Sequence, residues 1–181
     1  MSKPNCILPV KRTGNQKNPK LIILLSNPGG NPDWPKRLPE YAMDADGEYH
    51  DADMDLSVCR DYNEWFDDII NIAARYGIKP SQILLLEYYP YHTVRSADFI
   101  QNPNKWNSYA RDALTENVAI LRTHIVHDVP IFGYYYGCWL GVVPELKKYP
   151  FFYKSTGRWK KQKIFQLDNF LYNLHKNNKN F

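Results

Sequence analysis

The sequence has few cysteines, no long apolar run and no strong excess of one charge. Its three cysteines, Cys6, Cys59 and Cys138, are an odd number without the paired spacing of a zinc site, so they predict reduced thiols. No apolar run approaches the length that spans a membrane, and the N-terminus lacks an apolar leader segment. We therefore expect a cytoplasmic protein with no membrane partner.

The length and composition are those of a small globular protein. A chain of 181 residues is long enough for one hydrophobic core and too short for two, so we expect a single domain over residues 1–181. The net charge of +4 is compatible with a phosphate-bearing partner without requiring one. The 14 Tyr, 5 Trp and 8 Phe offer flat faces that stack on nucleobases or fill a small core.

Short apolar runs alternate with helical patterns along the chain. Four runs predict buried strands: 21–25, 83–86, 129–133 and 163–167. Helical spacing and end signals predict helices between and after them: 61–77, 106–124, 138–146 and 170–175. This alternation predicts an α/β fold in which a short four-stranded parallel sheet is flanked by helices on both faces. A short edge strand is also expected at 7–10.

The end of the first predicted strand is the best candidate for a binding site. The apolar run 21–25 stops at Asn27, Pro28, Gly29 and Gly30. Proline cannot donate to a β-ladder, and glycine permits positive φ and close approach of the backbone to a ligand. Ligands of open α/β sheets bind outside the carboxyl ends of the strands. The same residues also fit a sharp strand exit that has no further function.

The strand ends resemble those of the uracil-DNA glycosylase superfamily. In that family the first strand ends in a motif such as Gly-Met-Asn-Pro-Gly, and Asn27, Pro28 and Gly29 match its Asn-Pro-Gly core. The second strand of the family ends in an Asn that hydrogen-bonds to the uracil edge, and the corresponding stretch here is 87–90. The resemblance covers residues 21–167 and implies a three-layer fold with a short four-stranded parallel sheet. It also implies hydrolysis of the N-glycosidic bond of a DNA base.

Two positions depart from the family pattern. Glu87 stands where the family has the base-binding Asn, and an ionised carboxylate only accepts hydrogen bonds. It would suit a base edge that offers donors, such as an amino group. The His-Pro-Ser motif of the family is also absent, and residues 167–170 take its place. Asp168 would stabilise negative charge on a leaving base only when protonated. We therefore expect a divergent enzyme that acts on a modified or deaminated base.

The resemblance implies roles for the residues after the first strand. Asn27 would hold the attacking water, and the amides of Gly29 and Gly30 would approach the base or the sugar. Trp34 would supply a stacking face, and Asp33 would act as a general base. Asp33 fits a turn cap equally well.

The residues after the second strand supply further candidates. Glu87 directly follows an apolar run, so desolvation is expected to raise its pKa unless a partner makes it structural. His92 is the best substitute for the missing histidine of the family, although an isolated loop histidine is commonly solvent-exposed. Tyr88, Tyr89 and Tyr91 would line the pocket or serve only for packing. The turn at 134–136 is expected to complete the pocket.

A basic stretch with one aromatic residue precedes the fourth predicted strand. It contains Arg158, Trp159, Lys160 and Lys161. Basic residues around an aromatic ring can grip a phosphate backbone while the ring stacks on a base, and a solvated surface segment has the same composition. We take the nucleic-acid interpretation as the working hypothesis, with DNA or a nucleotide as the partner.

No metal site or cofactor is predicted. His124 and His127 are close enough in sequence to share a metal, but no third ligand is evident, so two surface histidines at a helix end are expected. The leading hypothesis is a cofactor-independent DNA-base N-glycosidase. A non-catalytic nucleic-acid-binding module on the same fold and an unrelated nucleotide-binding hydrolase are the alternatives.

Overall fold

The computed structural model describes residues 12–26, 56, 64–90 and 102–177 and shows an α/β fold built on a five-stranded mixed sheet. The strands are β1 (Arg12–Gly14), β2 (Leu21–Leu25), β3 (Ile83–Glu87), β4 (Ile131–Gly133) and β5 (Phe152–Lys154). Their order in the sheet is β1-β3-β2-β4-β5. β2 pairs in parallel with β3 and β4, β4 pairs in parallel with β5, and β1 runs antiparallel to β3 at one edge.

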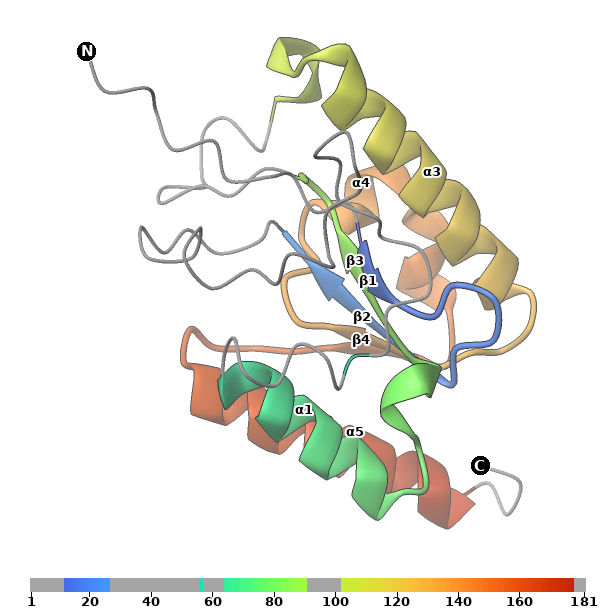
Figure 1. Cartoon of the computed structure of the whole chain (residues 1–181), viewed down its shortest axis with the longest axis vertical. Helices are drawn as coiled ribbons and strands as arrows, with labels where there is room; N and C mark the ends of the chain where they lie inside the picture. Colours follow the sequence, from blue (N-terminus) through green and yellow to red (C-terminus); the bar gives the residue numbers. More distant parts are fainter. Residues whose placement is uncertain (1–11, 27–55, 57–63, 91–101, 178–181) are drawn as a thin grey trace, which may run out of the picture.

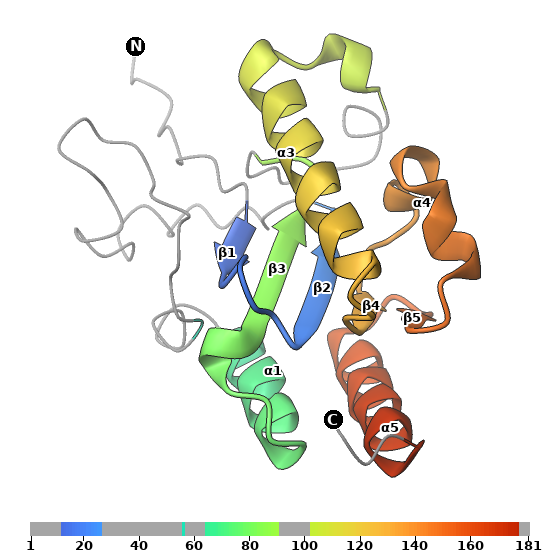
Figure 2. The same cartoon turned by 90° about the vertical axis from the view of Figure 1, so that its right-hand side faces the viewer.

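Helices cover both faces of the sheet (Figure 1). The α-helices are α1 (Glu64–Arg75), α3 (Ser108–Ile125), α4 (Trp139–Val142) and α5 (Lys160–Asn177). The short 3-10 helices are η4 (Pro80–Gln82), η5 (Pro103–Lys105) and η6 (Pro144–Lys148). The turned view in Figure 2 separates α1 and α5 on one side of the sheet from α3 and α4 on the other.

Burial on both faces explains the uninterrupted apolar strands. Every residue of β2 and β3 is buried, and alternate side chains enter two separate cores. Leu21, Ile23 and Leu25 of β2 pack with α1 and α5, whereas Ile22 and Leu24 pack with α3 and α4.

No helix of the described part of the chain is long and apolar enough to cross a membrane.

The predictions for the first three strands and for the long helices before and after β3 are confirmed, with small shifts of their ends. The helix predicted at 138–146 is instead divided into α4 and η6, and Pro144, which cannot donate the backbone hydrogen bond of a helix interior, begins the second part. The edge strand expected at 7–10 lies outside the described residues, and the edge position is occupied by β1.

The prediction of a fourth strand at 163–167 is wrong, because these residues belong to α5. The buried residues of α5 are Lys163, Gln166, Leu167, Phe170 and Leu171. This spacing of three and four residues is the stripe that one face of a helix presents to a core. The last strand is the short β5, so the sheet is five-stranded and mixed rather than four-stranded and parallel.

A substitution at Gly14 would test the close pairing of β1 with β3. Its φ is +101°, and a Cβ at this position would collide with the carbonyl oxygen of Ile83. Gly14→Ala should therefore lower the free energy of unfolding by about 2 kcal/mol or more, since the left-handed conformation alone costs an L-residue ~1–2 kcal/mol. Urea denaturation measures the loss. Gly141→Ala, a helical position with open space around it, is the matched control and should not destabilise the protein. Equal losses in both variants would contradict this packing.

Candidate active site

The carboxyl ends of the parallel strands meet at one edge of the sheet. Leu25 at the end of β2 lies opposite Glu87 of β3, and Leu24 lies opposite Gly133 of β4. The chain passes from β2 to α1 on one face of the sheet and from β4 to α4 on the other. The neighbouring ends of β2 and β4 therefore form the topological switch point, which is where open α/β sheets bind their ligands.

Hydrogen bonds fix the end of β2 beyond the regular ladder. The carbonyl oxygen of Leu25 accepts from the backbone N–H of Tyr88 at 3.1 Å and from the indole Nε1 of Trp139 at 2.7 Å. The carbonyl oxygen of Ser26 accepts from the N–H of Tyr89 at 2.9 Å. The chain is thus held in place up to the residue that precedes Asn27 in the sequence.

Glu87 is a buried carboxyl group at this edge. It is the last residue of β3 and is only 7% exposed, and its Oε2 has no hydrogen-bond partner among the described residues. Burial raises the pKa of Glu87 well above its usual value and so favours the protonated acid. A protonated carboxyl presents an O–H donor beside a carbonyl acceptor, whereas the ionised form only accepts. Burial therefore changes the hydrogen-bonding pattern expected from the sequence.

A network of polar side chains, buried at Asn117, supports the backbone of Glu87 from the α3 side. Asn117 of α3 is fully buried and donates from Nδ2 to the carbonyl oxygen of Glu87 at 2.9 Å. Its Oδ1 accepts from Nη1 of Arg12 at 3.3 Å, and the same guanidinium group pairs with Glu116 at 3.2 Å. Sequence reasoning missed Asn117. Its position could have been inferred from the helical spacing, because Asn117 lies between Leu114 and Leu121 on the buried face of the predicted helix.

Tyr88 and Tyr89 are buried and contact other aromatic rings. The ring of Tyr88 makes edge contacts with Trp106 at 5.3 Å and with Trp139 at 5.7 Å between centroids. The ring of Tyr89 lies 4.8 Å from that of Trp106. These contacts favour packing over direct ligand contact, so the two tyrosines stiffen the wall beside Glu87.

Lys163 is a second buried ionisable group at the carboxyl edge. It extends from α5, is 4% exposed and donates from Nζ to the carbonyl oxygen of Tyr134, directly after β4. Its Nζ also lies 3.5 Å from the ring centroid of Tyr135 and 4.7 Å from that of Tyr134. Burial lowers the pKa of Lys163 to about 8. Sequence reasoning missed its role because it placed Lys163 in a strand, although Lys163 begins the buried stripe of α5.

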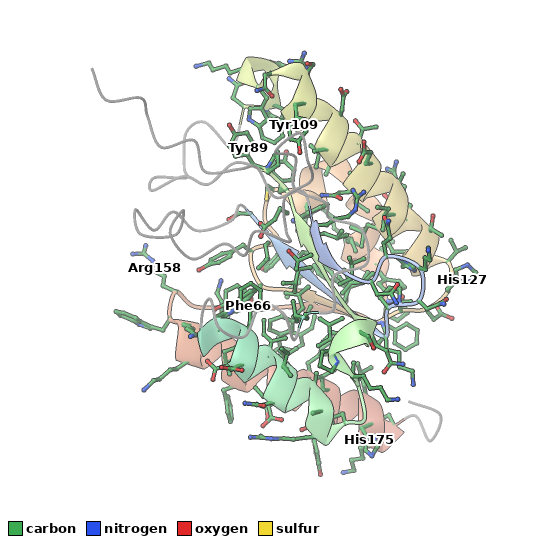
Figure 3. The ribbon with its side chains drawn as sticks, viewed as in Figure 1. Phe66, Tyr89, Tyr109, His127, Arg158 and His175 are labelled. Carbon is green, nitrogen blue, oxygen red and sulfur yellow. The ribbon has the colours of Figure 1, made fainter. Side chains whose placement is uncertain are left out.

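The basic stretch lies at the start of α5 and not before a strand. Arg158, Trp159 and Lys161 are exposed, and Trp159 is 78% exposed. Lys160 pairs with Asp68 of α1 at 3.4 Å. Figure 3 shows Arg158 on the same side of the molecule as Tyr89, which follows β3, and on the opposite side from His127. Ser155, three residues before Arg158, donates to the carbonyl oxygen of Gly133 at the end of β4, so the stretch begins a few residues from the carboxyl edge of the sheet.

Asp168 does not occupy the place of the missing family motif. It lies within α5 and accepts from the Tyr76 hydroxyl at 2.6 Å and from Nη1 of Arg75 at 3.2 Å. Arg75 is the last residue of α1, and Tyr76 follows it in the connection to the start of β3. Asp168 therefore lies toward the amino end of β3, away from the carboxyl edge of the sheet. The residues that do follow the last strand begin with Ser155, whose hydroxyl donates to the carbonyl oxygen of Gly133 at 2.6 Å.

The histidine pair does not form a metal site with any third ligand in the described ranges. His124 is buried, contrary to the expectation of two surface histidines, and its Nε2 lies 2.8 Å from the carbonyl oxygen of Gln16. Burial lowers the pKa of His124. Among the residues that the structure describes, no group of three His, Cys, Asp or Glu side chains is arranged to hold a metal ion.

The remaining predicted site residues lie outside the described part of the chain and stay predictions. They are Asn27, Pro28, Gly29, Gly30, Asp33, Trp34, Tyr91 and His92.

No protein-family model matches the sequence, and no curated protein is significantly similar to it. The candidate site is therefore defined by the described geometry, centred on Glu87 and Lys163.

The buried carboxyl of Glu87 should make stability depend on pH. Its pKa is raised in the folded state, so its contribution to stability is fully present below the usual glutamate pKa of about 4.3 and is lost as pH rises toward the folded-state pKa. Glu87→Gln keeps the shape of the neutral acid and cannot ionise. The variant should gain stability relative to the parent protein by up to ~1.4 kcal/mol per pH unit across that window. Urea denaturation from about pH 5 to pH 8 measures this difference, and a difference independent of pH would contradict the assignment.

Proposed function

We propose that this chain is a divergent DNA-base N-glycosidase whose base pocket lies at the carboxyl edge of β2, β3 and β4. The observation that carries the proposal is the buried carboxyl of Glu87, which has an oxygen without a partner among the described residues at this edge. Buried polar atoms are nearly always hydrogen-bonded, so a carboxyl oxygen that lacks a partner in the described part of the chain at the carboxyl edge, where open α/β sheets bind ligands, is suited to accept a hydrogen bond from a ligand or donate one to it.

The raised pKa of Glu87 favours its protonated form, and that form suits deaminated bases as the substrate class. Deamination replaces an exocyclic amino group with a carbonyl, which leaves a ring N–H donor next to a carbonyl acceptor, as in uracil, hypoxanthine and xanthine. A protonated carboxyl offers the complementary acceptor and donor. It therefore supplies the same pair of groups as the amide of the Asn in the resembling family, and it would not repel the base carbonyl as a carboxylate would.

The proposed chemistry also uses residues that the sequence singles out. Asn27, one residue beyond the fixed Ser26, is proposed to hold the water that attacks C1′ of the sugar. Asp33 and His92 are the proposed general base and the proposed group that stabilises charge on the departing base. Arg158, Trp159 and Lys161 are proposed to contact the phosphate backbone and stack on an unpaired base.

A base-release assay tests the role of Glu87. Oligonucleotides that carry uracil, hypoxanthine, xanthine or an alkylated base are incubated with the purified protein, and abasic product is quantified. Glu87→Gln keeps a donor and an acceptor and should retain most of the activity. Glu87→Met should lower kcat/KM by roughly 5- to 150-fold, because it loses hydrogen bonds worth ~1–3 kcal/mol. Equal activity of Glu87→Met and the parent protein would contradict base recognition by Glu87.

The same assay separates the alternative functions. Asn27→Ala should abolish turnover while leaving DNA affinity largely intact, and an equal loss of both would contradict its proposed role. Salt-sensitive DNA binding without base release from any substrate would favour a non-catalytic nucleic-acid-binding module. Stabilisation by small nucleotides without DNA binding would favour a nucleotide-binding hydrolase.

The exposed start of α5 should contribute to binding of single-stranded DNA. Trp159→Ala should weaken binding by ~1–3 kcal/mol, the usual value of one base stacked on an aromatic ring. Lys161→Gln should reduce the slope of log affinity against log salt by about 1. Fluorescence anisotropy at several salt concentrations measures both effects. Lys176→Gln, an exposed change in the last turn of the same helix, is the control and should leave the slope unchanged. No effect of either Trp159 or Lys161 would rule out this surface.

A further inference from the structure

Lys163 is a buried basic residue that the proposed base recognition does not use. Among the described residues no carboxylate pairs with it, and its polar contact is the carbonyl oxygen of Tyr134. Asp68 of the adjacent α1 is paired with the neighbouring Lys160. An ammonium group buried without a counter-ion is costly, so burial shifts the protonation equilibrium of this lysine toward the neutral amine.

The position of Lys163 connects it with the candidate active site. Its amine lies beside the residues that follow β4, at the switch point between β2 and β4. The backbone of Tyr135 is fixed there by its N–H bond to the carbonyl oxygen of Leu24 at 2.9 Å. The ring of Tyr135 is 46% exposed and lies over the amine. The partly exposed Tyr135 ring therefore lies between the amine and the surface at this edge.

A neutral, shielded lysine amine is suited to nucleophilic attack on a carbonyl group. Desolvation in an apolar pocket is one of the ways in which proteins activate a lysine for imine formation. The lowered pKa of Lys163, about 8, leaves a substantial neutral fraction in mildly alkaline solution. An aldehyde is therefore the class of ligand that this amine would take.

We propose that Lys163 is a catalytic nucleophile that condenses with the aldehyde of an abasic deoxyribose and cleaves the DNA strand by β-elimination. The proposal rests on the proposed function, because base excision from DNA generates this sugar. Its ring-opened form carries an aldehyde at C1′, and the excision site and Lys163 lie at the same edge of the sheet.

The chemistry requires only water as a co-reactant. The amine lone pair attacks C1′, and the aldehyde oxygen leaves as water; with one proton taken up from solvent, the product is a protonated imine. Loss of the C2′ proton to solvent forms the C2′–C3′ double bond, while the C3′–O bond breaks and its electron pair leaves with the 3′ phosphate. Hydrolysis of the imine consumes one water and restores the amine of Lys163.

Borohydride trapping on preformed abasic DNA tests this step. A synthetic abasic oligonucleotide is mixed with the full chain and sodium borohydride, which reduces an imine to a stable amine by supplying hydride. We expect one covalent protein–DNA adduct, mapped by mass spectrometry to Lys163, and strand cleavage in the absence of borohydride. Since the substrate is already abasic, the result does not depend on base release, so failure here and failure of the glycosidase proposal are distinguishable.

Three variants complete the test. Lys163→Arg keeps the positive charge and a donor for the Tyr134 carbonyl but cannot form the imine, so adduct and strand cleavage should fall to background. Lys163→Met should give the same result with a neutral side chain. Lys176→Met, at an exposed lysine of the same helix, should react as the parent protein does. Absence of any adduct with the parent protein, an adduct mapped to another lysine, or an adduct that persists in Lys163→Arg would overturn the proposal.

Discussion

The parallel pairing of β2 with β3 on one side and β4 on the other is the constraint on which the rest of the structure depends. It buries β2 completely and brings the ends of three strands to one level, so that Leu25 becomes the centre of the carboxyl edge. The Leu25 carbonyl then accepts hydrogen bonds from Tyr88 and from Trp139, which come from the two neighbouring connections. The position of the candidate site thus follows from the sheet order before any side-chain chemistry is considered.

The same pairing explains why an acid and an amine are found in one region. Glu87 ends β3 opposite Leu25 of β2, and Lys163 reaches from α5 to the carbonyl oxygen of Tyr134, which follows β4, so both groups lie at the carboxyl edge of the sheet. Burial shifts the pKa of Glu87 upward and that of Lys163 downward, so it raises the neutral fraction of each group. A neutral acid can donate and accept hydrogen bonds, and a neutral amine can attack a carbonyl group. These are the properties on which the proposed recognition of a base edge and the proposed attack on an aldehyde depend.

The sequence predicted the elements whose own residues carry a clear hydrophobic pattern. It did not predict the elements and buried polar residues whose positions depend on contacts with distant parts of the chain. β2 and β3 were predictable because burial on both faces requires continuous apolar runs, and Glu87 was predictable as a site candidate from its place at a strand end. β1 and β5 have three residues each and contain Arg12 and Lys154, so they have no apolar run. The stripe of α5 includes Lys163 and Gln166, whose burial depends on partners that precede α5 in the chain: the carbonyl oxygen of Tyr134 for Lys163, and Thr156 for Gln166. Asn117 was missed for the same reason.

The central claim is that Glu87 binds a base edge as a neutral acid, and NMR of protein carrying ¹³C-labelled glutamate tests it most directly. The Glu87 carboxyl signal would be assigned by its loss in Glu87→Gln and followed at neutral pH while free uracil or hypoxanthine is added. We predict the chemical shift of a protonated carboxyl that moves on addition of the base. A signal typical of an ionised carboxylate, unchanged by either base, would contradict the claim.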